Sequence, residues 1–366
     1  MTIGGGTFDG IIYGASAVKT DSAKGNGTRH TAGNVTLTIT GGETTKGTQS
    51  CIFAGGYATG NATGTVYTVD SVTANISGGD WGEAAGGRGV FGGIMASGVE
   101  AQVIGNVNIT ISGDATMGNV YGGGWAQKEN AKSIVGDVNI NIEGGTITNV
   151  FGGGSHSTSG GATETGDVTI TVSGGDITGA IYARGQLDHD EVGSASVIFK
   201  GATDFTCDVY GYSYVGGAAS DAALSFSSYT GEFSGNIGGF NGITLDKATV
   251  MTLATAASDV SNGAWEFDLT DRASTLAGTS LLTWSGASFV DDTIKVTFAD
   301  DVQAQGDWNI ATVAEAFSGA TFDVKIGDSE IVAGLAYNQQ ISDGDYQGWG
   351  FTLESGVLKF KNLASA

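Results

Sequence analysis

Proline is absent from the 366 residues, and charged residues make up only 14% of them. Glycine supplies 64 residues but follows no strict three-residue period, which excludes a collagen-like helix. Hydrophobic residues reach 40%, so the chain has enough apolar material for a core and too little charge for an intrinsically disordered protein. We therefore expect a folded, glycine-rich protein.

Basic residues are scarce, because 15 Lys and Arg stand against 38 Asp and Glu and leave a net charge of −23. This charge repels phosphate backbones and anionic membrane surfaces, so nucleic acid is not an expected partner. No run approaches the roughly 18 apolar residues of a membrane span, and none is predicted. Cys51 and Cys207 are too few for a disulfide framework, and we expect both thiols to be free and unreactive.

A repeated segment dominates the first two thirds of the sequence. Residues 136–154 return as residues 166–185, and weaker copies start at Gly33 and Gly105. The second half of the unit is an aliphatic residue, then an aromatic residue, then Gly or Ala. It occurs at residues 12–14, 52–54, 90–92, 120–122, 150–152, 181–183 and 209–211, with a degenerate copy from Ile237.

Each unit shows the alternation that is typical of a strand with one buried face. In residues 168–173 Val and Ile alternate with Thr and Ser, and Gly174 and Gly175 follow as a turn. Such strands bury their apolar face only when successive units stack. We expect an all-β protein, a β-solenoid of the right-handed β-helix type with about eight Gly-rich coils. A β-propeller fits less well, because the shortest units are too short for four strands.

The repeat dissolves near residue 240 into irregular strand-like runs. We therefore expect a Gly-rich repeat solenoid over residues 1–240, and irregular final coils with a β-rich C-terminal cap over residues 241–366. Gly5 and Gly6 align with Gly144 and Gly145, so the sequence begins in mid-repeat. On this basis we expect a piece of a longer protein whose signal peptide and anchor lie outside these residues.

The Gly-rich copies, the absence of proline, the Thr and Asn decoration and the closing residues 349–363 carry a family resemblance. They resemble the β-helical passenger region of bacterial autotransporter and adhesin-like surface proteins. The resemblance implies an extracellular or cell-surface location and adhesion. We expect an adhesin-like or structural binding module without catalysis, whose partner is a surface protein or glycan of a host or neighbouring cell, or a second copy. The alternative is a polysaccharide-binding or polysaccharide-cleaving β-helix protein.

An aromatic residue recurs at one position of every unit. Its aliphatic neighbour and the following Gly or Ala share one strand face, so the aromatic ring takes the other. The rings are either an exposed stripe that binds a ligand, or a stack covered by the protein itself. The candidate binding residues of this aromatic column are Tyr13, Phe53, Phe91, Tyr121, Phe151, Tyr182 and Tyr210.

Asp188, Asp190 and Glu191 form the one dense acidic cluster, with His189 inside it. Their hard oxygens suit a divalent cation, so we name these acids as candidate ligands for Ca²⁺ and expect no other cofactor. The same residues are the best site for the alternative, polysaccharide-active function. His156 lies in a Gly-rich stretch with no acid beside it in the sequence, so we expect a loop residue without a catalytic role.

Polar residues that favour β-structure occupy the outward positions of the other strand. We expect a soluble outer face, because Asn residues and Glu143 interrupt the Thr pattern that an ice-binding array would need. These positions are Thr36, Thr38, Thr40, Asn108, Thr110, Asn139, Asn141, Thr169 and Thr171.

Overall fold

The structure is a computed structural model, and it is all-β, as predicted. Its described residues contain one four-residue helix, α1 (Val302–Gln305), and one 3-10 turn, η2 (Leu363–Ser365). It describes every residue except 21–28, 46–50, 61–63, 83–88, 158–160, 188–189, 216–220, 255–263, 271, 273–277, 285–292, 301, 314–318 and 366.

The chain divides into two compact units, and each is described by itself. Unit 1 comprises residues 1–197 and 207–222, and unit 2 comprises residues 198–206 and 223–366. Strand β21 (Ala195–Gly201) crosses this division. The chain therefore passes between the units at residues 197–198, 206–207 and 222–223, all before residue 240, where the sequence pattern fades.

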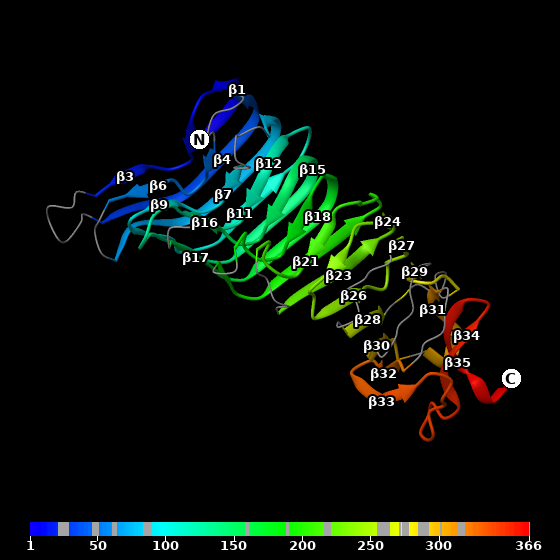
Figure 1. The fold of residues 1–366 in the computed structure, drawn as a ribbon. Coiled ribbons are helices and arrows are strands. Elements are labelled where there is room, and N and C mark those ends of the chain that lie inside the picture. The colour runs from blue at the N-terminus through cyan, green and yellow to red at the C-terminus, as the bar shows by residue number, and fades with distance from the viewer. Residues whose placement is uncertain are drawn as a thin grey trace. The chain divides into compact units, whose positions relative to one another are not determined.

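Equivalent strands of successive repeats pair in parallel throughout unit 1 (Figure 1). The first ladder contains β1 (Thr2–Phe8), β4 (His30–Thr44), β7 (Thr65–Trp81), β11 (Val107–Ile111), β15 (Val138–Phe151) and β18 (Val168–Ile177). The second contains β2 (Ile11–Tyr13), β5 (Cys51–Phe53), β8 (Val90–Phe91), β12 (Thr116–Tyr121), the end of β15, β19 (Ala180–Tyr182) and β22 (Asp208–Tyr210).

Two shorter ladders complete unit 1. The third contains β3 (Ala17–Lys19), β6 (Tyr57–Thr59), β9 (Met95–Ser97), β13 (Trp125–Ala126) and β16 (Ser155–His156). The fourth joins the starts of β4 and β7 to β10 (Glu100–Val103), β14 (Lys132–Val135), β17 (Ala162–Thr165) and β20 (Glu191–Val192). Each repeat therefore contacts mainly the repeats before and after it.

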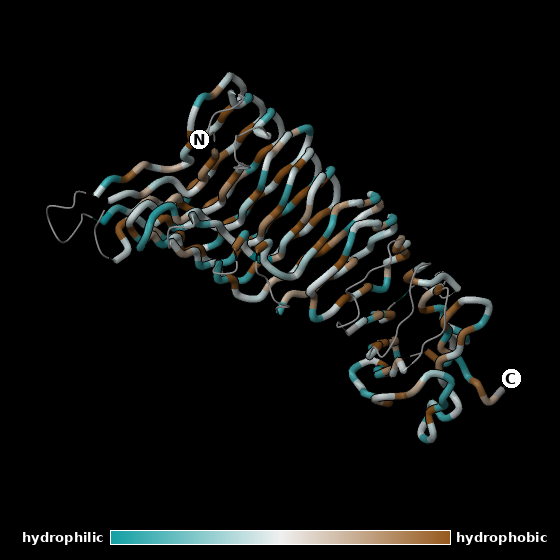
Figure 2. Tube along the Cα trace, viewed as in Figure 1, coloured by the Kyte–Doolittle hydropathy of each residue, from teal (hydrophilic) through white to brown (hydrophobic). Residues whose placement is uncertain are grey.

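The core of unit 1 consists of columns of aliphatic side chains. Val72, Val107, Val138 and Val168 follow one another in register on four strands, and none is more than 2% exposed. Figure 2 shows hydrophobic segments recurring along these strands. Burial of each such side chain stabilises the fold by about 1.5–3 kcal/mol. The predicted alternation of buried and outward residues is confirmed.

Glycine permits both the bend and the close stacking of the repeats. Gly145 has φ +82°, and there β15 turns a corner while its pairing with β18 shifts register. Only glycine adopts this conformation without strain. A Cβ atom on Gly122 would lie 2.2 Å from the carbonyl oxygen of Gly152. The position after the aromatic residue thus lets the next backbone approach.

Unit 2 continues with parallel pairing and ends in antiparallel hairpins. One ladder contains β23 (Ala222–Tyr229), β26 (Gly242–Leu245), β28 (Ala264–Leu269), β30 (Thr293–Phe298) and β32 (Thr321–Ile326), followed by antiparallel β33 (Ser329–Ala336). The other contains β24 (Glu232–Phe233), β27 (Met251–Leu253), β29 (Leu282–Trp284) and β31 (Trp308–Val313), followed by antiparallel β35 (Val357–Asn362) and β34 (Trp349–Glu354). Strand β25 (Ile237–Gly238) is a short additional strand.

Candidate functional site

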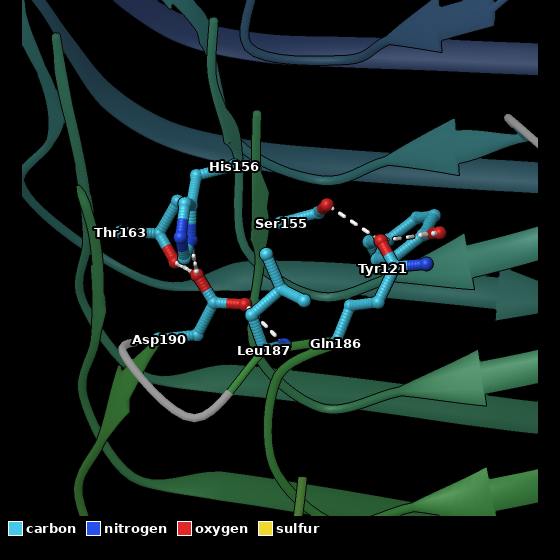
Figure 3. A network of polar contacts seen from close by, with 7 residues as sticks. All are labelled: Tyr121, Ser155, His156, Thr163, Gln186, Leu187 and Asp190. Atoms are coloured by element: carbon cyan, nitrogen blue, oxygen red, sulfur yellow. Dashed lines mark hydrogen bonds and ion pairs between the residues drawn. The ribbon is translucent and has the colours of Figure 1, made fainter. Parts of the chain in front are cut away.

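The most concentrated polar chemistry in unit 1 surrounds the carboxylate of Asp190 (Figure 3). Its Oδ1 atom lies 3.0 Å from His156 Nδ1 and accepts a hydrogen bond of 2.5 Å from Thr163 Oγ1. Its Oδ2 atom accepts a hydrogen bond of 2.8 Å from the Leu187 amide. The side chain of Asp190 is fully buried and that of His156 is only 7% exposed.

Three chain segments build this cluster. His156 ends β16 and Thr163 belongs to β17 of the same repeat, whereas Asp190 follows β19 of the next repeat. The Asp190 amide donates to the Leu187 carbonyl at 3.0 Å, which closes the turn that aims its carboxylate inward. A Cβ atom on Gly185 would lie 2.3 Å from Asp190 Cβ, so this position needs glycine for space.

The expectation that His156 stands without an acid is wrong. Asp190 lies 34 residues away in the sequence, and the turn that follows the next repeat folds it back against the imidazole. No local spacing signals this contact, because it depends on the lengths of two loops. The stacking of successive repeats predicts that the segments of His156 and Asp190 lie side by side. It does not predict that their two side chains touch.

A second hydrogen-bonded group joins the same loop to the aromatic column. Gln186 Oε1 accepts hydrogen bonds from Ser155 Oγ at 2.6 Å and from Tyr121 Oη at 3.3 Å (Figure 3). Asn119 Nδ2 donates to Tyr121 Oη at 3.1 Å, and Asn149 Nδ2 donates to Asn119 Oδ1 at 3.0 Å. Hydrogen bonds therefore hold the loop that carries Asp190 at two residues, Gln186 and Asp190 itself.

A histidine beside a buried carboxylate is the arrangement that orients a general base. A nucleophilic serine would have to face the imidazole, whereas the hydroxyls of both sequence neighbours of His156 donate to other groups. The Ser155 hydroxyl donates to Gln186, and the Ser157 hydroxyl donates to the carbonyl of Gln127. The described contacts support a fastening role for the His156–Asp190 pair.

The candidate metal ligands do not converge in the described structure. Asp188 and His189 lie outside the described residues, and both carboxylate oxygens of Asp190 already accept hydrogen bonds. Glu191 is exposed at the start of β20 and pairs in register with Glu164. Within the described ranges no group of three His, Cys, Asp or Glu residues is spaced to hold a metal. Calcium binding remains a prediction.

The rings of the aromatic column stack on one another, on the strand face opposite the aliphatic core. Successive centroids lie 4.7 Å apart for Phe53 and Phe91, 4.2 Å for Phe91 and Tyr121, and 4.7 Å for Tyr121 and Phe151. None of these four rings is more than 2% exposed. Met95 and Trp125 of the third ladder belong to the same buried cluster.

Of the two alternatives for the column, the structure shows the stack that the protein itself covers. Only its ends lie nearer to solvent, because Tyr13 and Tyr210 are half-buried. Burial raises the pKa of Tyr13 and of Tyr182 to about 12, so these phenols stay protonated even near pH 10, where an exposed tyrosine is about half ionised. The central rings stabilise unit 1 and present no surface to a ligand.

Cys51 and Cys207 are both buried, and they form no disulfide with each other, as predicted. Burial raises the pKa of Cys207 to about 12, which keeps the thiol protonated and unreactive. We expect iodoacetamide at about pH 8 to leave Cys207 unmodified in the folded protein and to label both cysteines in guanidinium chloride. Dithiothreitol will not change the melting temperature. Rapid labelling of folded protein, measured by mass spectrometry, would contradict this assignment.

The outward face of the first ladder carries two columns of uncharged polar side chains. All of them are exposed or half-buried, and the strand pairing holds them in register. Strand geometry spaces them by about 4.8 Å between strands and about 6.8 Å along each strand. The columns are Thr36, Thr73, Asn108, Asn139 and Thr169, and Thr38, Asn75, Thr110, Asn141 and Thr171.

Comparisons of this chain with protein-family models, with curated proteins and with solved structures find no match. In the described part of the chain no helix is long and apolar enough to cross a membrane.

Proposed function

We propose that this chain is a β-solenoid that acts as an adhesin-like binding module without catalysis. The observation that carries the proposal is the first ladder, whose outward face presents two in-register columns of uncharged polar side chains. A sheet face of this kind offers many equivalent hydrogen-bonding groups at fixed spacing. Such a face suits an extended partner that lies across several repeats.

We also propose where the protein acts. The resemblance to the passenger regions of bacterial autotransporter and adhesin-like proteins supports an extracellular location at a bacterial cell surface. The partner is then a protein or glycan on a host or neighbouring cell, or a second copy of the chain. A net charge of −23 favours partners that are neutral or basic.

A specific observation favours the alternative of a polysaccharide-active protein. The buried His156–Asp190 pair, with its 3.0 Å contact, is a type of group that catalytic sites use. We rank this alternative second, because the Ser155 and Ser157 hydroxyls donate to Gln186 and Gln127, and because among the described residues the carboxylate of Glu191 is exposed whereas that of Asp190 is buried.

Binding of fluorescently labelled protein to fixed epithelial cells tests the adhesin-like function. We expect saturable binding that weakens at least about fivefold in the double variant Thr110→Glu, Thr171→Glu, because added charges disrupt the uncharged face. The matched control is Thr244→Glu, Thr252→Glu, at half-buried strand positions of unit 2. Absence of saturable binding, or equal loss in both double variants, would overturn the proposal.

The alternative has its own test on the same protein. Polysaccharides incubated with the wild-type chain are assayed for new reducing ends or unsaturated products. Cleavage that disappears in His156→Gln, while the variant keeps its circular dichroism spectrum, would establish the polysaccharide-active function. No cleavage by the wild-type chain supports the binding module.

A further inference from the structure

The aromatic column loses its cover at the last repeat of unit 1. Tyr182 is 8% exposed and Tyr210 is half-buried, whereas Tyr214 is 58% exposed and Val215 is 46% exposed. Among the large hydrophobic residues that the structure describes, only Met1 and Ile104 are exposed to a similar degree. Tyr214 and Val215 are thus two of the four exposed large hydrophobic residues in the described structure, and they lie where the column ends.

The exposed ring of Tyr214 is held in place. The ring of Tyr214 meets that of Tyr182 edge to face, with centroids 5.2 Å apart at 79°. The Val215 amide donates to the Gln186 carbonyl at 3.1 Å, and Val215 forms a parallel bridge with Leu187. The segment of Tyr214 and Val215 is therefore preorganised, and little conformational entropy is lost when a ligand binds there.

A fourth tyrosine extends the same surface. The ring of Tyr212 stacks on that of Tyr210 with centroids 5.0 Å apart, and Tyr210 in turn lies 5.4 Å from Tyr182. Tyr210 Oη donates to Asp208 Oδ2 at 3.0 Å, so a carboxylate lies at the edge of the rings. Burial raises the pKa of Tyr182, and the nearby Tyr214, Tyr212 and Asp208 raise it further.

We infer that Tyr182, Tyr210, Tyr212 and Tyr214, with Asp208 at their edge, form a binding site for a neutral oligosaccharide. A sugar ring has an apolar C–H face and a rim of hydroxyl groups. The exposed ring of Tyr214 and the half-buried ring of Tyr212 fit the first, and phenolic and carboxylate oxygens fit the second. The strong negative charge of the chain disfavours anionic sugars.

This inference deepens the proposed binding function by naming a ligand class and a second surface. The flat polar face belongs to the first ladder, whereas the tyrosine site lies at β19, β22 and the residues that follow them. The two can fail separately. Cell binding that depends on Thr110 and Thr171 would persist if the tyrosine site binds no sugar, and sugar binding would persist if the flat face binds no cell.

Isothermal titration calorimetry with neutral cello-, xylo-, manno- and chito-oligosaccharides tests the inference on the full chain. We expect at least one of them to bind with a Kd of about 1 mM or tighter. Tyr214→Ala and Tyr212→Ala will each weaken that binding by at least about tenfold. The matched control is Ile104→Ala, which removes an equally exposed apolar side chain and will leave the Kd unchanged.

Several outcomes overturn the inference. They are no binding to any of the four oligosaccharides, binding that both tyrosine variants retain, and binding of acidic oligosaccharides alone. A further contrary result is a concentration-dependent dimer that Tyr214→Ala abolishes without any titratable sugar, since the patch would then bind a second copy. Melting temperatures verify that the variants remain folded, which is expected because Tyr214 is largely exposed.

Discussion

Replacing Tyr121 with alanine will lower the free energy of unfolding by about 3–5 kcal/mol, the loss typical of truncating a large buried aromatic side chain. The ring is 2% exposed and stacks on Phe91 at 4.2 Å and on Phe151 at 4.7 Å. Its removal leaves a cavity inside the column and deprives Gln186 of one hydrogen bond. Chemical denaturation followed by circular dichroism measures the loss.

Two control variants separate the causes of this effect. Tyr121→Phe keeps the stacked ring and removes only the hydroxyl that contacts Asn119 and Gln186, so we expect a loss of about 1–2 kcal/mol. Tyr214→Ala, at an exposed position, will change stability by no more than about 0.5 kcal/mol. Equal stabilities for wild type and Tyr121→Ala would show that the column is not packed as described.

Asp190→Ala will destabilise the protein by about 3–5 kcal/mol, because it leaves several buried hydrogen-bonding groups without their acceptor, at a cost of about 1–3 kcal/mol each. The change leaves Thr163 Oγ1 and the Leu187 amide without their acceptor, and it leaves His156 without its carboxylate. The loop that connects β19 to β20 will loosen first. Hydrogen exchange at the amides of Leu187 and Asp190, measured with the unfolding curve, will report this local effect.

The isosteric variant Asp190→Asn is the control for packing. It fills the same space and keeps one acceptor oxygen, so its loss should be smaller than that of the alanine variant. A double-mutant cycle with His156→Gln then gives the coupling between the two side chains. If Asp190→Ala unfolds at the same denaturant concentration as wild type, the pair does not fasten the loop.

Much of the strand arrangement of unit 1 follows from its repeated sequence. Residues 138–142 and 168–172 carry the same alternation, so pairing them in register places Val over Val and Ile over Ile. The same alternation correctly put Tyr121 on the face opposite Val120. The pattern did not predict which residues cover the aromatic face. Met95 and Trp125 cover it, and they come from the third ladder, whose short strands lack a repeated motif.

The candidate site was harder to predict than the strands. Asp190 and Glu191 are adjacent in the sequence, yet their side chains lie in different surroundings. Asp190 is buried and Glu191 is exposed. The partner of Asp190 is His156, which a loop contact across two repeats brings near.

The in-register pairing of β15 with β18 has a consequence for how such a chain can grow. These strands belong to the two most similar copies. Their pairing places similar residues opposite each other, such as Val138 opposite Val168 and Ile140 opposite Ile170. A tandem duplication of about thirty residues would therefore produce a segment already complementary to its parent. Lengthening requires no new interface, so mutation can shape the outward residues of each added copy independently of the inherited core.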